Sequence, residues 1–99
     1  MSTIGTRKVH THESIAPGHT VHSTWNNPPW NTVLGYFAYP VPVTPSGEHG
    51  SHSGTVEVTR VTCHHLKKND GPDDKHVTIY VKNCGDEMTG AEVWQSWIG

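Results

Sequence analysis

The chain has 99 residues, of which 32% are hydrophobic and only 16% are charged, and its net charge is −2 when the histidines are neutral. This length fits a single domain, residues 1–99, with one thin core. The few basic residues are scattered, which excludes the electrostatic footprint of a nucleic-acid-binding protein. The longest apolar run, residues 33–43, is interrupted by glycine and proline, so we expect no membrane insertion.

The chain is rich in histidine and tryptophan, with 9 and 4 residues respectively. Together with threonine, serine and asparagine, the histidines supply the polar surface that charged residues provide in most domains. This composition is typical of β-rich binding proteins rather than helical ones. The first residues lack the apolar segment of a signal peptide, so we take the cytoplasm as the default location.

Apolar and polar residues alternate with a period of two in several runs, and glycine, proline, asparagine or aspartate bounds each run. The run at 4–11 is weakly apolar and is expected to be an edge strand. The run at 32–39 is apolar on both faces, which favours a central strand, and the prolines that follow should end its ladder. We predict strands at residues 4–11, 19–25, 32–39, 55–66, 76–83 and 91–98.

The segment between the fourth and fifth strands is saturated with turn formers, so these strands should form an antiparallel hairpin. The predicted register places Val61, Cys63 and His65 opposite Val81, Ile79 and Val77 respectively, all on the apolar face. Burial there would hold His65 neutral and make the fold less stable in acid. Val58 has the opposite parity, so either a bulge re-phases the strand after it or that end packs on its other face. In this register Cys84 lies too far from Cys63 for a disulfide.

The last predicted strand, 91–98, is the most ambiguous element. As a strand it places Trp94 and Ile98 on one face, and Val93 and Trp97 on the other. As a helix it clusters all four residues. Aromatic and β-branched residues favour the strand. With about six to seven strands, we predict an all-β fold, a small antiparallel β-sandwich of Ig-like or jelly-roll type.

Tryptophans and amides gather in one segment that two prolines make rigid, residues 22–31. We expect Trp25, Trp94 and one tyrosine to belong to the core. An exposed ring beside amide donors can stack on a sugar while the amides bind its hydroxyls. We therefore predict a lectin-like, non-catalytic module that binds a carbohydrate or glycoconjugate. Its predicted site residues are Trp30, Asn26, Asn27, Asn31 and His22.

The same aromatic surplus also suits protein interfaces. The alternative hypothesis is therefore a structural or self-assembling interaction domain that forms a homo-oligomer. A homo-oligomer is compatible with both readings, because weak single sites gain avidity when they are multiplied. No nucleophile, phosphate or dinucleotide motif occurs in the chain, so we expect no enzyme activity.

A third hypothesis concerns metal. His10 and His12 are two residues apart, so on a strand both imidazoles point to the same side, as a zinc or copper site requires. This pair resembles the H-x-H element of the cupin family, and Pro45 to His49 resembles its P-x-G-x-x-H element. The resemblance implies a metal-binding protein. The spacing departs from the family pattern, because Glu13 directly follows the second histidine and His49 comes one residue early.

Overall fold

The computed structural model describes residues 3–26, 32–43, 53–71 and 73–98, and these contain six antiparallel strands and no α-helix. The all-β prediction is confirmed, and the ambiguous tail is a strand. The strands are β1 (Ile4–Ile15), β2 (Thr20–Asn26), β3 (Val33–Val41), β4 (Val56–Leu66), β5 (Asp74–Asn83) and β6 (Thr89–Ile98).

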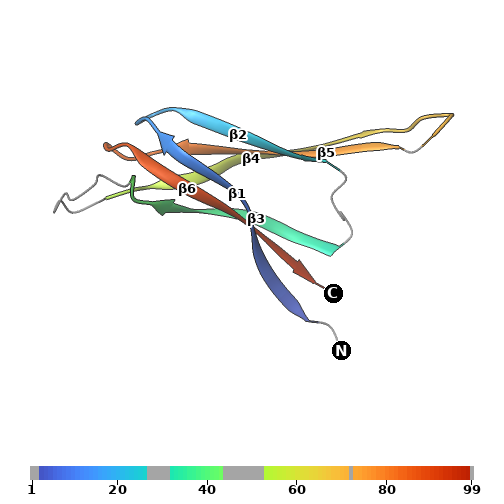
Figure 1. The fold of residues 1–99 in the computed structure, drawn as a ribbon, viewed down its shortest axis with the longest axis horizontal. Helices are drawn as coiled ribbons and strands as arrows, with labels where there is room; N and C mark the ends of the chain where they lie inside the picture. Colours follow the sequence, from blue (N-terminus) through green and yellow to red (C-terminus); the bar gives the residue numbers. More distant parts are fainter. Residues whose placement is uncertain (1–2, 27–31, 44–52, 72, 99) are drawn as a thin grey trace.

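The strands form two three-stranded sheets, one with the order β1-β6-β3 and the other with the order β2-β5-β4 (Figure 1). Among the six described strands, only β4 and β5 follow each other within one sheet; the other consecutive strands lie in different sheets. The central strands are β5 and β6, and they carry most of the buried residues. The prediction that the third strand is central is therefore wrong. Because β3 has a free edge, it can include Pro40, which lacks a donor for a second ladder.

The core draws on both sheets. Alternate residues of β5 and β6 are fully buried, and Ile15 at the end of β1 joins them in one cluster. Side chains from the remaining strands pack against it, Trp25 among them, as the sequence predicted for that residue. Strand periodicity explains the pattern, since every second side chain points to the same face. The buried apolar residues are Ile15, Val77, Ile79, Val81, Ala91 and Val93.

A buried asparagine at the end of β5 is hydrogen-bonded to three backbone groups of neighbouring segments. The side chain of Asn83 is 0% exposed. Its Nδ2 donates to the carbonyl oxygens of Ile15 at 2.8 Å and Glu87 at 2.7 Å, and its Oδ1 accepts from the Gly85 N–H at 2.9 Å. All of its polar atoms therefore have partners, as burial requires.

The β4–β5 hairpin forms with a register two residues from the predicted one, so that Val61 lies opposite Ile79 and Cys63 opposite Val77. The predicted bulge is present between Val58 and Arg60. The cysteines are free. The Cys84 N–H bonds to a carbonyl just before β4, about eight strand residues or ~25 Å from Cys63, so no disulfide can join them.

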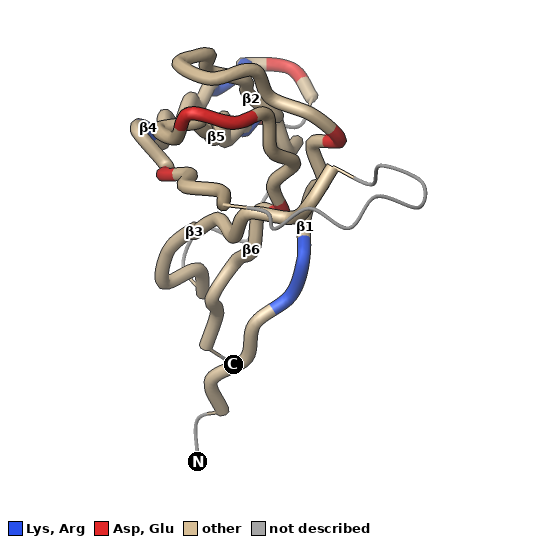
Figure 2. The backbone as a smooth tube through the Cα atoms, turned by 90° about the vertical axis from the view of Figure 1, so that its left-hand side faces the viewer, with Lys and Arg blue, Asp and Glu red and all other residues tan. Residues whose placement is uncertain are grey.

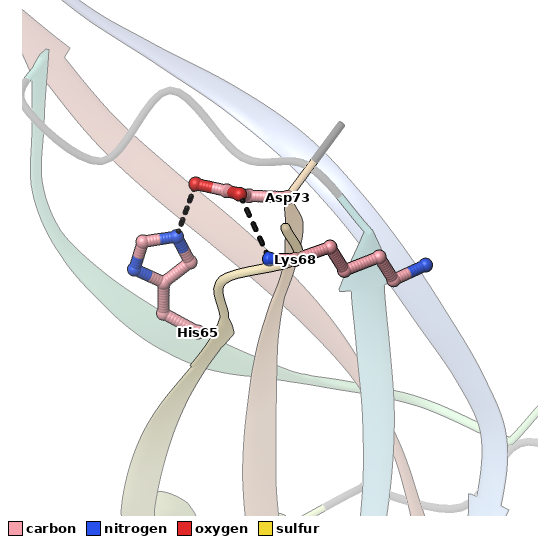
Figure 3. Close-up of polar contacts among 3 residues, drawn as sticks. All are labelled: His65, Lys68 and Asp73. Atoms are coloured by element: carbon pink, nitrogen blue, oxygen red, sulfur yellow. Dashed lines mark hydrogen bonds and ion pairs between the residues drawn. The ribbon is translucent and has the colours of Figure 1, made fainter. Parts of the chain in front are cut away.

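The burial predicted for His65 is wrong. The hairpin tip projects past the ends of the other sheet, which leaves its inner face uncovered (Figure 1). Val61, on this face opposite buried Ile79, is already 40% exposed. His65 is exposed, and its Nε2 lies 3.0 Å from Asp73 Oδ2. Asp73 also accepts from the backbone N–H of Lys68 at 3.2 Å (Figure 3). These bonds, that of His65 first, lower the pKa of the Asp73 carboxyl.

Candidate functional site

Two of the predicted carbohydrate-binding residues, His22 and Asn26, lie on β2, and both point to the outer face of the β2-β5-β4 sheet. His22 lies opposite Tyr80, with ring centroids 5.6 Å apart. The other three predicted residues, Asn27, Trp30 and Asn31, lie outside the described residues. His22 and Asn26 therefore lie on the same face of the sheet, four residues apart on one strand.

Asn26 belongs to a row of side chains that crosses this face. Its Oδ1 accepts a hydrogen bond from His76 Nδ1 at 2.7 Å. The ring of His76 stacks on His64, with centroids 6.1 Å apart and an interplanar angle of 12°. Because Nδ1 donates this hydrogen bond, the Nε2 lone pair of His76 is available to a ligand. The amide of Asn26 therefore orients an imidazole as well as presenting its own donor.

The outer face of the other sheet carries a group of aromatic side chains outside the predicted site. Phe37 and Tyr39 alternate on β3, and Phe37 lies opposite Trp94 of β6. The Phe37 and Tyr39 rings are 5.4 Å apart, and the Tyr39 and Trp94 rings 6.4 Å apart, both edge to face. Tyr39 is 53% exposed. We call these three residues the aromatic face.

Trp94 was expected in the core, and this expectation is wrong. Its neighbours Val93 and Gln95 are buried, so alternation places Trp94 on the outside of β6. Its indole Nε1–H donates to Glu92 Oε1 at 3.2 Å, and the other oxygen of Glu92 pairs with Lys8 Nζ at 3.5 Å. The aromatic face is therefore bordered by a carboxylate and an ammonium group, both held by defined contacts.

The predicted metal ligands His10 and His12 do lie side by side on β1, with ring centroids 4.5 Å apart. His12 Nε2 is shielded from solvent and has no hydrogen-bond partner among the residues that the structure describes. Burial, and then the charges of His10 and His22, lower the pKa of His12. Among the described residues, no three histidine, cysteine or acidic side chains are grouped so that they could hold a metal ion. A zinc or copper site here stays a prediction.

The comparisons with known proteins add no relative: no family model, no curated protein and no solved structure matches this chain. Within the described ranges, no helix is long and apolar enough to span a membrane.

Proposed function

We propose that the protein is a non-catalytic, lectin-like module that binds carbohydrate through its aromatic face. The observation that carries this proposal is the row formed by Tyr39, Trp94 and Glu92, where an exposed ring and a partly exposed ring lie beside an oriented carboxylate. A contiguous aromatic group on an open surface usually marks a site of interaction. The C–H face of a pyranose can stack on such rings while its hydroxyls bond to polar groups beside them.

The polar border of the site is arranged in advance. Trp94 and Lys8 each hold one oxygen of Glu92, so little side-chain freedom remains to be lost when a sugar binds. The remaining lone pairs of this carboxylate can accept hydroxyl groups. Because the face lies on a sheet rather than in a deep pocket, it suits a sugar within an extended glycan chain.

The proposal is tested with a panel of neutral and acidic oligosaccharides, followed by calorimetry on the best ligand. Removal of Trp94 or Tyr39 by alanine should weaken binding at least tenfold, equivalent to about 1.4 kcal/mol. Alanine at His22 or Asn26, on the opposite outer face, provides the matched control. Loss of binding in the His22 and Asn26 variants alone would instead locate the sugar at the end of β2, as the sequence predicted.

Self-association is the second candidate function. Apolar residues flank the aromatic face: Ile4 is 67% exposed and lies opposite Ile98 on the same side of the sheet as Trp94. Covering this surface with a second copy would remove apolar area from water, which stabilises the oligomer by about 25 cal/mol for each Å² buried. Light scattering after size exclusion distinguishes the two functions. If Trp94→Ala converts an oligomer into monomers and no glycan binds, the face is an assembly interface.

The topology favours one of the two predicted sandwich types. We propose a jelly-roll sandwich, because consecutive described strands lie in different sheets everywhere except at the β4–β5 hairpin. The pairing of β1 with β6 and β2 with β5 agrees with this arrangement, in which the two halves of the chain wrap around each other as one long hairpin. The shared core cluster of both sheets also supports it.

A further inference from the structure

A chain of polar side chains runs from the interior of the β1-β6-β3 sheet to its edge. Gln95 is 0% exposed and donates from Nε2 to the Tyr36 hydroxyl at 3.2 Å. Its Oε1 accepts from Arg7 Nε at 3.0 Å. The guanidinium carbon of Arg7 lies 5.2 Å from the centroid of the Trp25 ring on the neighbouring sheet. Two independent contacts thus fix the orientation of one arginine.

This arrangement leaves the recognition edge of Arg7 unused. Its Nε is bound to an amide, which brings no negative charge, and within the described residues no carboxylate pairs with it. The two terminal nitrogens still carry four N–H donors in a planar fork. A fork already oriented and still carrying its full charge is suited to bidentate binding of a carboxylate.

Arg7 lines a hollow of about 290 Å³, together with Lys8 and Val9 of β1 and with Thr24 and Trp25 of β2. Figure 2 shows the two basic residues of β1 as the blue stretch of its backbone. The Lys8 ammonium pairs with Glu92 beside the aromatic face, so Arg7 supplies the charge of the hollow. Among the described strands, β1 pairs only with β6 and β2 only with β5, and both strands line this hollow with their other edges unpaired there. The hollow therefore combines positive charge, an indole ring and unpaired backbone groups.

We infer that this hollow binds a small ligand through a carboxylate group, with Arg7 as its anchor. Trp25 supplies an apolar wall for the carbon skeleton that bears the carboxylate, such as the ring of a uronic acid. Gln95 acts as a positioning residue, because it aims the guanidinium without reaching the hollow itself. The site lies at the edge of the sheets and does not depend on sugar binding by the aromatic face.

The chain offers an internal control for this inference. Of its two arginines, Arg60 also lies over an aromatic ring, 4.8 Å from the Tyr80 centroid, but on the outer face of the other sheet. A ¹⁵N-labelled sample gives one Nε–H resonance for each arginine, and Arg7→Gln and Arg60→Gln variants assign them. Both resonances are followed during titration with sodium glucuronate at constant ionic strength, and in parallel with sodium phosphate and sodium chloride.

The inference predicts a saturable shift of the Arg7 resonance with glucuronate and no saturable shift of the Arg60 resonance. Arg7→Gln should weaken binding at least tenfold, whereas Arg60→Gln should leave it within twofold. Gln95→Met should weaken binding while the Arg7 resonance broadens or moves before ligand is added. Equal, non-saturating shifts of both arginines would overturn the site, and saturation by phosphate but not glucuronate would overturn the carboxylate assignment.

Discussion

Replacing Asn83 with alanine should remove the main polar link between β5 and the segments around it. The substitution deletes three hydrogen bonds and leaves the carbonyls of Ile15 and Glu87 and the N–H of Gly85 without this partner. Each bond contributes roughly 0.5–1.5 kcal/mol net, and a buried group left unpaired costs about 1–3 kcal/mol. We expect a loss of about 3 kcal/mol in the free energy of unfolding.

For a domain of this size, such a loss corresponds to a fall in Tm of roughly 12–24 °C. Urea denaturation and thermal melting monitored by circular dichroism measure it. Asn26→Ala is the matched control, because that exposed asparagine makes one side-chain bond, to His76, and should cost under about 1 kcal/mol. If both variants lose less than about 1 kcal/mol, the role assigned to Asn83 is wrong.

Two further predictions concern the inner face of β1. A Cβ at Gly5 would collide with the ring of Trp97, whereas one at Gly35 would meet no described atom within 4 Å. Urea denaturation should therefore show a loss of about 1–3 kcal/mol in the free energy of unfolding for Gly5→Ala and no measurable loss for Gly35→Ala. The pKa of His12 is lowered in the folded state. The free energy of unfolding should therefore be unaffected by this group above the unfolded pKa of ~6.5 and should fall as pH drops below that value. Tm should thus be lower at pH 5.5 than at 7.5, and His12→Gln should reduce this difference. The exposed His19→Gln variant is the control and should keep it. An equal difference in the unsubstituted protein and both variants would contradict this.

The strands were predictable because strand formation shows in local alternation. All six predicted runs are strands, and their ends differ by only a few residues from those observed. Strand neighbours were harder to predict, because pairing joins segments far apart in the chain. Apolar residues on both faces of β3 indicated a central strand. Both faces of β3 are apolar because one face packs on the core through Tyr36 and Ala38, while the other carries Phe37 and Tyr39.

The candidate site was missed for the same reason. Phe37 and Trp94 are far apart in the sequence, and only the pairing of β3 with β6 brings them opposite each other. The alternation of Trp94 with buried Val93 and Gln95 was the available signal, because it separated the two faces of the last strand. The exposure of His65 could not be predicted from parity alone, since it depends on how far the other sheet extends.

Carbohydrate binding by the aromatic face is tested most directly at the indole of Trp94. Indole N–H resonances in a ¹⁵N spectrum, assigned by single Trp→Phe variants, are followed during titration with the best oligosaccharide from the panel. The account predicts that the Trp94 resonance shifts saturably, because its Nε1–H bonds to Glu92 at the proposed site, and that the Trp25 resonance stays in place. A bound oligosaccharide that leaves the Trp94 resonance unmoved, or a Trp94→Ala protein with affinity within twofold, would contradict it.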